Sequence, residues 1–596
     1  MPGDRPASEL IGPFQACLHA SRGALGRPAR RDTPRGRTEN PVGHGTVDTM
    51  TIPDGGPAAG PDPDPADLAF GAFSSHPPWV LDLDRLSWSA GIDGLRQRTR
   101  AEAPRLTRKR RLPPGKRVVR VAAILGTALA GWYVGDRRRG QHRSRAGLSR
   151  RLRRAFERLG PTYIKLGQIL SSGEGLFPEE LVTEFRLLRD RVPAEPFAVV
   201  RRIVEADLGM TLEQQFSEFE RTPIAAASVA QVHAARLKSG EAVVVKVQRP
   251  DVAALVRRDL AAMSWLAPLL VGRIPVAALA NPPALVELFG ETIVEELDFR
   301  LEAQNMLDVA RVLADTDQHA IVVPRPHPSL VTRRVLVMER LDGFAWGDAD
   351  AMRAAGIDTE EVLHAALIAF LEGALLYGVF HGDLHGGNLF VQSDGRVALL
   401  DFGITGRFDE PRRLAFLRLV MAASANDVPG QIAAMRDLGA LPVDVDIDAV
   451  IHDLGLDRPP IDPTTLTAEE LTSEIRNLTK GLLGYGARMP KELMLYVKDM
   501  LFLDGALAVM APNVDVIGEI VRVVLYFHER HGDRIAKEMG VEPGTIPALD
   551  VAGIRASLGV GEAVDAITYR ELQERRELIR RRLEHHQRGR RGRRRS

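Results

Sequence analysis

The segment His381-Gly382-Asp383-Leu384-His385-Gly386-Gly387-Asn388 is followed, a short distance along the chain, by Asp401-Phe402-Gly403. Between these polar stretches lie two apolar runs, 388–391 and 397–400, separated by the turn residues Ser393-Asp394-Gly395. Short apolar runs around such a turn predict a β-hairpin. The hairpin would bring the two polar loops side by side, so we expect their side chains to form one site.

The side chains of these two loops are those that phosphoryl transfer requires. The reaction needs Mg²⁺ on the phosphate groups and a carboxylate beside the incoming nucleophile. In this interpretation Asp383 is the catalytic carboxylate and faces the nucleophile, while Asn388 and Asp401 bind the metal. The spacing matches the catalytic loop and the Asp-Phe-Gly motif of kinases.

Two other interpretations of the same segment remain open. Two histidines and a carboxylate can bind zinc, which would make His381, Asp383 and His385 a metal site. The segment could also be an ordinary polar loop. Neither interpretation explains why Asn388 and the Asp401-Phe402-Gly403 motif occur together in this order.

A kinase-like site also needs a lysine on a strand and a glutamate on a helix. Lys246 lies in an apolar strand at the end of a predicted hairpin made of 227–237 and 242–247. A buried lysine is costly unless it is paired, and Glu302, in a helix predicted over 285–313, is its best partner. We therefore expect Lys246 and Glu302 to serve catalysis.

The nucleotide would be held by a hinge strand and a covering loop. The apolar run 335–338 predicts the strand that meets adenine, with Met338 and Glu339 as nucleotide-binding residues. No Gly-x-Gly-x-x-Gly precedes the strand lysine, and the expected place holds Ala225-Ala226-Ala227-Ser228. Alanine restricts the backbone where glycine would let it approach phosphate. The nucleotide should sit differently from that of an ordinary protein kinase, which argues against protein phosphorylation.

From Arg117 to Gly518 the chain resembles the UbiB/ADCK family of atypical, protein-kinase-like proteins. The segment 160–168 contains the family's KxGQ motif, and 225–228 matches its Ala-rich loop. Glu296-Leu297-Asp298 matches its ExD motif, with Glu302 as the paired helix glutamate, and 489–493 resembles its C-terminal helical region.

The resemblance implies an α+β, bilobal protein-kinase-like fold with an N-terminal KxGQ helical extension and a largely helical C-lobe. It implies regulatory roles for Lys165, Gly167 and Gln168, on helices that lie over the active site where a protein substrate would dock. There Lys165 and Gln168 would meet Glu296 and Asp298. It also implies ATP and Mg²⁺ as cofactors, ATPase rather than protein-kinase activity, and support of isoprenoid-quinone biosynthesis or lipid homeostasis.

The sequence departs from the family pattern in several places. The segment 170–173 lacks the family's usual arginine, and Leu384 and Gly386 stand where prolines are common. The loop 381–385 is equally similar to that of small-molecule kinases of the aminoglycoside/choline type. That alternative and a nucleotide-gated, non-enzymatic scaffold both stay open.

Composition divides the chain into six segments: 1–80, a disordered N-terminal region; 81–147, a basic segment with a short apolar helix; 148–220, the KxGQ extension; 221–343, the N-lobe; 344–540, the C-lobe with its helical extension; and 541–596, a helix and basic tail. Lys and Arg number 79 against 78 Asp and Glu, so the net charge of +1 does not indicate a nucleic-acid binder. A single cysteine, Cys17, excludes an intramolecular disulfide framework.

The apolar run 121–134 ends in Trp-Tyr-Val and has arginines on both sides. A spanning helix needs about 20 apolar residues, so this run predicts an interfacial helix rather than a span. The Arg-rich C-terminal end shows neither of the two membrane helices common in bacterial members. We therefore expect a cytoplasmic protein, peripheral at the inner face of the cell membrane. Beyond a nucleotide, the candidate partners are an anionic membrane surface, lipid or quinone intermediates and a biosynthetic protein complex.

Overall fold

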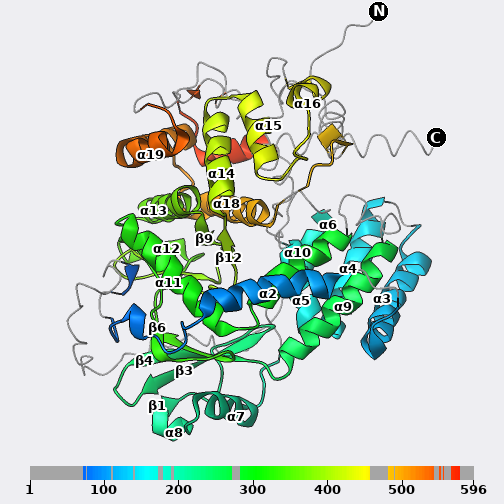
Figure 1. Ribbon diagram of the computed structural model, residues 1–596, viewed down its shortest axis with the longest axis vertical. Helices are drawn as coiled ribbons and strands as arrows, with labels where there is room; N and C mark the ends of the chain where they lie inside the picture. The colour runs from blue at the N-terminus through cyan, green and yellow to red at the C-terminus, as the bar shows by residue number, and fades with distance from the viewer. Residues whose placement is uncertain are drawn as a thin grey trace, which may run out of the picture.

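The computed structural model describes residues 72–74, 77–108, 112–138, 141–171, 179–188, 193–270, 282–456, 481–482, 484–488, 490–542, 550–551, 555 and 566–577. These residues form a bilobal α+β fold of the protein-kinase type, as the sequence predicts. Figure 1 shows an N-lobe built on a sheet, a C-lobe of mostly helices, and a group of helices packed at the side of the N-lobe.

The N-lobe sheet is antiparallel, in the order β1-β3-β4-β7-β6, with β2 on β3. Its strands are β1 (Phe216–Phe219), β2 (Ala225–Ala226), β3 (Ala230–Leu237), β4 (Ala242–Gln248), β6 (Pro326–Val331) and β7 (Val335–Glu339). The predicted first hairpin is confirmed as β3 and β4. Its first strand starts at Ala230 because residues 227–230 form a turn, in which the Ala227 amide donates to the Ala230 carbonyl at 2.8 Å.

The two faces of this sheet have different neighbours, since successive side chains of a strand point to opposite sides. Val243, Val245 and Val247 of β4 pack with α7 (Phe197–Leu208) and α8 (Leu212–Gln215). The alternate residues Val244 and Lys246 face the other way. Because β1, α7 and α8 belong to this lobe, the N-lobe begins before the predicted boundary at residue 221.

The single helix predicted over 285–313 is wrong. The structure has two helices, α10 (Pro282–Glu295) and α11 (Phe299–Asp315). Asp298 breaks the helix because its backbone is extended and its carboxylate accepts a hydrogen bond from the amide of Arg300, which caps α11. The ExD motif is therefore the connection between two helices, with Glu302 in the first turn of the second.

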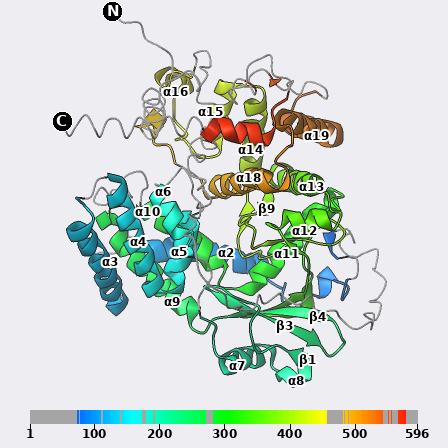
Figure 2. The same cartoon turned by 180° about the vertical axis from the view of Figure 1, so that it is seen from behind.

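Five helices pack at the side of the N-lobe: α2 (Ile92–Thr107), α3 (Gly115–Gly135), α4 (Gln141–Leu159), α5 (Pro161–Ser171) and α6 (Glu179–Phe185). They join α9 (Val252–Leu270) and α10 around one apolar core. The prediction of a short apolar helix is wrong in length, because α3 has 21 residues. Among the described residues, α3 is the one helix that is long and apolar enough to cross a membrane. It lies beside α4 at the outer edge in both views (Figures 1 and 2).

The end of the predicted disordered region needs correction, while residues 1–71, 75 and 76 lie outside the described part. Ala72 and Phe73 are buried in the main core. The carbonyl of Ala72 accepts a hydrogen bond of 3.0 Å from the amide of Val323, and the indole of Trp79 donates one of 3.0 Å to the carbonyl of Pro326. The segment is therefore held by hydrogen bonds to Val323 and to Pro326 at the start of β6.

The C-lobe carries the predicted second hairpin, which is confirmed as β10 (Leu389–Val391) and β11 (Val397–Leu399) in the sheet β5-β11-β10-β8. The short strand β9 (Val379–His381) precedes this hairpin in the sequence, and β12 (Thr405–Arg407) follows it. The two strands pair with each other as a separate antiparallel sheet. The remaining elements are β5 (Ile321–Val322), β8 (Phe344–Ala345), α12 (Ala349–Ala354), α13 (Thr359–Glu372), the π-helix η4 (Gly373–Tyr377), α14 (Glu410–Ser424), α15 (Val428–Asp437), α16 (Ile447–Asp453), α18 (Lys491–Met510) and α19 (Val516–Met539).

Helix α18 is central to the C-lobe. Its Tyr496 is buried and stacks on Phe370 of α13, with ring centroids 5.2 Å apart. It also contacts Phe416 of α14 at a centroid distance of 4.6 Å. These contacts fix α18 against α13 and α14, and Figure 1 shows the helix beside β9. Of the predicted C-terminal helix, residues 569–577 are helical, and the basic tail lies outside the described residues.

Candidate active site

The loop after β9 is fixed by the buried ring of His381. Its Nδ1 accepts a hydrogen bond of 3.1 Å from the amide of Asp383, so Nε2 carries the proton and donates to the carbonyl of Leu400 at 3.0 Å. Burial lowers the pKa of His381 and keeps the ring neutral. Both ring nitrogens are engaged, which leaves no lone pair for a metal. Within the described residues no group of three His, Cys, Asp or Glu could hold a metal ion, so the zinc interpretation is not supported.

Asp383 lies between two lysines that are distant in sequence. One carboxylate oxygen is 2.6 Å from Nζ of Lys498, and the other is 4.0 Å from Nζ of Lys165. Burial alone would raise the pKa of Asp383, but the positive charges of Lys498 and Lys165 outweigh it and hold that pKa well below its usual range. Asp383 is therefore ionised at any physiological pH.

Lys246 joins the two lobes at the centre of the site. Its Nζ is 2.6 Å from a carboxylate oxygen of Glu302 on α11 and 2.9 Å from one of Asp401. Burial raises the pKa of Glu302 to about 7, against the attraction of Lys246. Burial would also raise the pKa of Asp401, but the charges of Lys246 and Lys165 bring it below its usual range.

The backbone of Asp401 is in the left-handed region, with φ of 58°. A non-glycine residue in this region costs of the order of 1 kcal/mol, although Asp tolerates it better than most residues. The conformation turns the carboxylate toward Lys246, and the side chain keeps 44% of its surface exposed. A partly exposed, ionised carboxylate in a fixed orientation is suited to a metal ion.

Asn388 and Asp401 are chemically suited to Mg²⁺, which prefers oxygen ligands. The side-chain nitrogen of Asn388 donates to the carbonyl of Asp383 at 3.0 Å, so its side-chain oxygen is the atom that can ligate a metal. The loops that carry the two residues are joined by a hydrogen bond from the Leu400 amide to the Asn388 carbonyl at 2.8 Å. The donor set therefore fits a magnesium ion.

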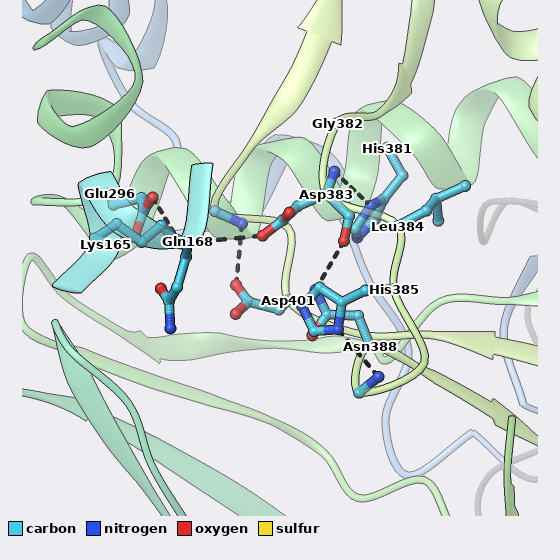
Figure 3. Close-up of polar contacts among 12 residues, drawn as sticks. Lys165, Gln168, Glu296, His381, Gly382, Asp383, Leu384, His385, Asn388 and Asp401 are labelled. Carbon is cyan, nitrogen blue, oxygen red and sulfur yellow. Dashed lines mark hydrogen bonds and ion pairs between the residues drawn. The ribbon is translucent and has the colours of Figure 1, made fainter. Parts of the chain in front are cut away.

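The KxGQ motif lies on α5 and reaches the carboxylate of Asp383. Lys165 is 3.1 Å from Glu296, and Figure 3 shows the Lys165 side chain between Glu296 and Asp383. Gly167 is needed for packing, because a Cβ at that position would come within 2.2 Å of Leu188 Cδ1. Gln168 donates to the carbonyl of Leu188 at 3.3 Å.

Asp298 has a structural role in addition to the one that the family resemblance implies. Its carboxylate caps α11 and forms an ion pair of 2.8 Å with Arg300. Its meeting with the KxGQ residues stays a prediction. Of the two ExD carboxylates, Glu296 is the one that Lys165 contacts.

The Ala-rich segment forms β2 and the tight turn before β3. Ala225 and Ala226 pair with Val232 and Gln231 of β3, and Ser228 is buried. A residue that sequence reasoning missed, Arg249, holds the turn in place. Its side chain, only 5% exposed, donates to the carbonyls of Ala227 and Pro193 at 2.9 Å each and pairs with Glu195 at 2.8 Å. The loop is consequently braced by a buried guanidinium.

The predicted hinge residues differ in orientation. Met338 pairs with Val244, so its side chain shares the face that also carries Lys246. The carboxylate of Glu339 points away and accepts a hydrogen bond of 3.2 Å from the amide of Arg325. Burial raises the pKa of Glu339 to about 7. A nucleotide at this hinge would meet the main chain of Glu339, not its side chain.

Comparison with known proteins agrees with this geometry. Residues 187–434 match the model of the ABC1 atypical kinase-like domain. A probable protein kinase UbiB of Aeromonas hydrophila is 32% identical over 379 residues, which are 62% of this chain and 69% of that protein. The chain belongs to the UbiB/ADCK family. The kinase-like domain of this family is, in general terms, a nucleotide-binding fold.

This UbiB/ADCK protein has further relatives in a bacterium and in a plant. An uncharacterized protein of Mycobacterium tuberculosis is 37% identical over 372 residues, 62% of this chain and 76% of the relative. Protein ACTIVITY OF BC1 COMPLEX KINASE 1 of Arabidopsis thaliana is 33% identical over 366 residues, 61% of this chain and 53% of the relative. The match to the solved structure of Rv3197 with erythromycin, from M. tuberculosis, covers 58% of this chain and 91% of that chain, at 23% identity and a TM-score of 0.34.

Two residues of α18 that sequence reasoning missed complete the site of this UbiB/ADCK protein, beyond the span of the domain model. Lys498 donates to Asp383 and, at 2.9 Å, to the carbonyl of Gly382. Asp499 accepts a hydrogen bond of 3.0 Å from the amide of Leu384. A sequence signal existed, because the two charges interrupt an apolar helical run over 493–503, and buried charges require partners.

Proposed function

We propose that this protein is a Mg-ATP-dependent ATPase or phosphotransferase of the UbiB type. The observation that carries the proposal is the contact of Lys246 with both Glu302 and Asp401, at 2.6 Å and 2.9 Å. Phosphoryl transfer in kinases requires the strand lysine, the helix glutamate and the metal-binding aspartate to be in place together. An ATP-binding role accounts for three charged groups gathered between the two lobes.

Each residue has a defined role in this proposal. Lys246 would contact the phosphate groups, and the oxygens of Asp401 and Asn388 would hold Mg²⁺. A bound magnesium ion would neutralise the charge of the phosphates. Asp383 stays ionised because its pKa is held low, which makes it a weak base. It would orient the attacking water or hydroxyl by accepting its hydrogen bond, and this suits a loose transition state that needs little proton abstraction.

The membrane and pathway assignments are part of the proposal. The outer face of α3 exposes Val119, Tyr133 and Val134 by 68%, 60% and 87%. Both ends of the helix carry exposed cations: Lys116, Arg120, Arg137 and Arg138. Such a helix suits the surface of an anionic bilayer. We place the protein in the cytoplasm, peripheral at the inner face of the membrane, where it would support isoprenoid-quinone or lipid metabolism and contact a biosynthetic complex.

The test is ATP hydrolysis by the purified protein, with and without anionic liposomes. The Asp401→Asn variant should lose turnover and metal-dependent nucleotide binding. Asp350→Asn, a change at a fully exposed side chain, is the matched control and should behave like the wild type. Unchanged MgATP affinity in Asp401→Asn would overturn the proposal. A stoichiometric phosphorylated metabolite would favour a small-molecule kinase, and biological activity retained in Asp383→Asn would favour the scaffold.

A further inference from the structure

The charged pair Lys498-Asp499 lies in the most apolar part of α18. Asp499 is fully buried, and the side chain of Lys498 is only 15% exposed. Burial raises the pKa of Asp499 well above its usual range, against the charge of Lys498. In the described part of the chain, one carboxylate oxygen of Asp499 has no hydrogen-bond partner. Two ionisable groups in such a position are costly.

Stability alone does not explain this pair. A buried ion pair is often no better than apolar residues of the same volume, because desolvation offsets the attraction. Asp383 also has a second cation close by, since Lys165 lies 4.0 Å away. The charge of Asp383 is therefore partly balanced without Lys498. The presence of the Lys498-Asp499 pair must be explained by the residues that it contacts.

The pair contacts three consecutive residues of the catalytic loop. Lys498 binds the Gly382 carbonyl and the Asp383 carboxylate, and Asp499 binds the Leu384 amide. Adjacent residues on a helix point about 100° apart, so the two side chains reach the loop from different directions. A two-point attachment of this kind fixes both the position and the orientation of the loop.

Lys498 also has a donor to spare for a ligand. An ammonium group has three hydrogens, and the two hydrogen bonds to Gly382 and Asp383 account for two. Asp499 lies 3.7 Å from Nζ, which is beyond hydrogen-bond distance. Its partner Asp383 is the carboxylate beside which the transferred phosphoryl group would lie. A cation in that position would stabilise charge on the terminal phosphate.

We propose that Lys498 and Asp499 form a clamp on the catalytic loop. Lys498 is a catalytic residue that orients Asp383 and donates a hydrogen bond to the terminal phosphoryl group of the nucleotide. Asp499 is a positioning residue that acts through the Leu384 amide. This inference rests on the proposed function and adds to it a terminal-phosphate contact from α18.

The test compares the variants Lys498→Met and Lys498→Arg with Lys491→Met in the full chain. Lys491 is the matched control because it lies on the same helix with 14% exposure and pairs with Glu295 at 3.7 Å, away from the catalytic loop. The first readout is equilibrium binding of a magnesium-bound, non-hydrolysable ATP analogue and of Mg-ADP. Lys498→Met should weaken triphosphate binding by about tenfold, the loss of one charge-assisted hydrogen bond, with diphosphate binding unchanged.

The second readout is turnover. Lys498→Met should lower kcat more than it raises KM for ATP, and Lys498→Arg should restore part of both. Asp499→Leu should lower kcat while keeping the triphosphate-to-diphosphate affinity ratio, and Asp499→Asn, which keeps the acceptor for the Leu384 amide, should restore kcat. Folding of every variant is checked by its thermal midpoint.

The outcomes separate the clamp from the proposed function. A folded Lys498→Met variant with the wild-type affinity ratio overturns the clamp and leaves the proposed function standing. The clamp is also overturned if Lys491→Met lowers the triphosphate-to-diphosphate affinity ratio as much as Lys498→Met does. The loss would then come from a general disturbance of α18. If the wild type binds neither nucleotide, the proposed function fails, and the clamp fails with it. If the wild type binds without turnover, the affinity ratio alone decides.

Discussion

Asn305 donates a hydrogen bond of 2.9 Å from its side-chain nitrogen to the main-chain carbonyl of Phe402. This contact ties the helix that carries Glu302 to the Asp-Phe-Gly segment that carries Asp401. The side-chain oxygen of Asn305 accepts from Arg407 at 2.8 Å and from Arg96 of α2 at 3.1 Å. One buried amide thus connects the two carboxylates that hold Lys246, and α2 is part of the same network.

Replacing Asn305 with alanine should loosen both carboxylates at once. The buried Phe402 carbonyl and the two guanidinium groups would lose a partner, which costs about 1–3 kcal/mol for an unsatisfied buried group. We expect the free energy of unfolding in urea to fall by about that amount and MgATP affinity to fall with it. Gln304→Ala is the control, since its amide donates to Asp308 at 2.8 Å. Equal loss of affinity in both variants would contradict the prediction.

Glu339→Gln should make stability less sensitive to pH. Burial raises the pKa of Glu339 from 4.5 to about 7 in the folded state. Between these values the folded protein keeps the proton and the unfolded chain releases it, so wild-type stability falls as pH rises through this window. At about 1.4 kcal/mol per pKa unit, the wild type should lose nearly 3 kcal/mol of unfolding free energy between pH 4.5 and pH 8, and the variant should not lose it.

Urea unfolding of Glu339→Gln and the wild type at pH 4.5 and pH 8 checks this sign. The variant should gain relative to the wild type at the higher pH. The Glu339 carboxylate accepts a hydrogen bond from the Arg325 amide and points away from the sheet face that carries Lys246. Nucleotide affinity should therefore stay unchanged. A variant that loses nucleotide binding would show that the side chain contacts the ligand.

Lys165 and Glu296 should show strong coupling in a double-mutant cycle. Their side chains are only 14% and 10% exposed and lie 3.1 Å apart. Lys165→Met removes the cation that neutralises the buried Glu296 carboxylate. Removing one partner of a buried ion pair lowers the free energy of unfolding by about 3–5 kcal/mol. Adding Glu296→Gln should recover a large part of that loss. If the two losses simply add, the pair does not interact in the folded protein.

The ends of α3 should differ in how firmly they are held. Asp259 is fully buried and pairs with Arg117 at 2.5 Å, whereas Asp136 pairs with Arg151, which is 39% exposed, at 3.0 Å. Asp259→Ala should therefore release the start of α3 and raise its hydrogen exchange, and Asp136→Ala should have a small effect. Equal protection in both variants would mean that the apolar contacts alone hold the helix.

Local sequence patterns predicted the parts of the site that depend on short-range chemistry. The turn 393–395 between two apolar runs predicted the β10-β11 hairpin, which sets Asn388 beside Asp401. The cost of burying Lys246 predicted a carboxylate partner, and Glu302 lies 2.6 Å from it. Both inferences use constraints that act within a motif or on a single buried charge.

The missed features depend on tertiary context. Helical periodicity continues through 285–313, so it could not show that Asp298 adopts an extended backbone and divides the helix. The spacing of motifs could not place Lys498 beside Asp383, because 115 residues separate them. The length of α3 was underestimated because its first turns carry Lys116, Arg117 and Arg120, which a hydropathy pattern excludes although the helix includes them.

The position of α18 late in the sequence has a consequence for the order of folding. During synthesis the chain emerges from its N-terminus, and domains generally fold as units. Lys165, Lys246, Asp383 and Asp401 all emerge before Lys498. Until α18 follows, the Asp383 carboxylate lacks its 2.6 Å partner and the Leu384 amide lacks its acceptor. A nascent chain that already contains the whole matched domain would therefore lack the contacts of the loop 382–384 with α18, and under the proposed function it would not turn over nucleotide before α18 has packed against this loop.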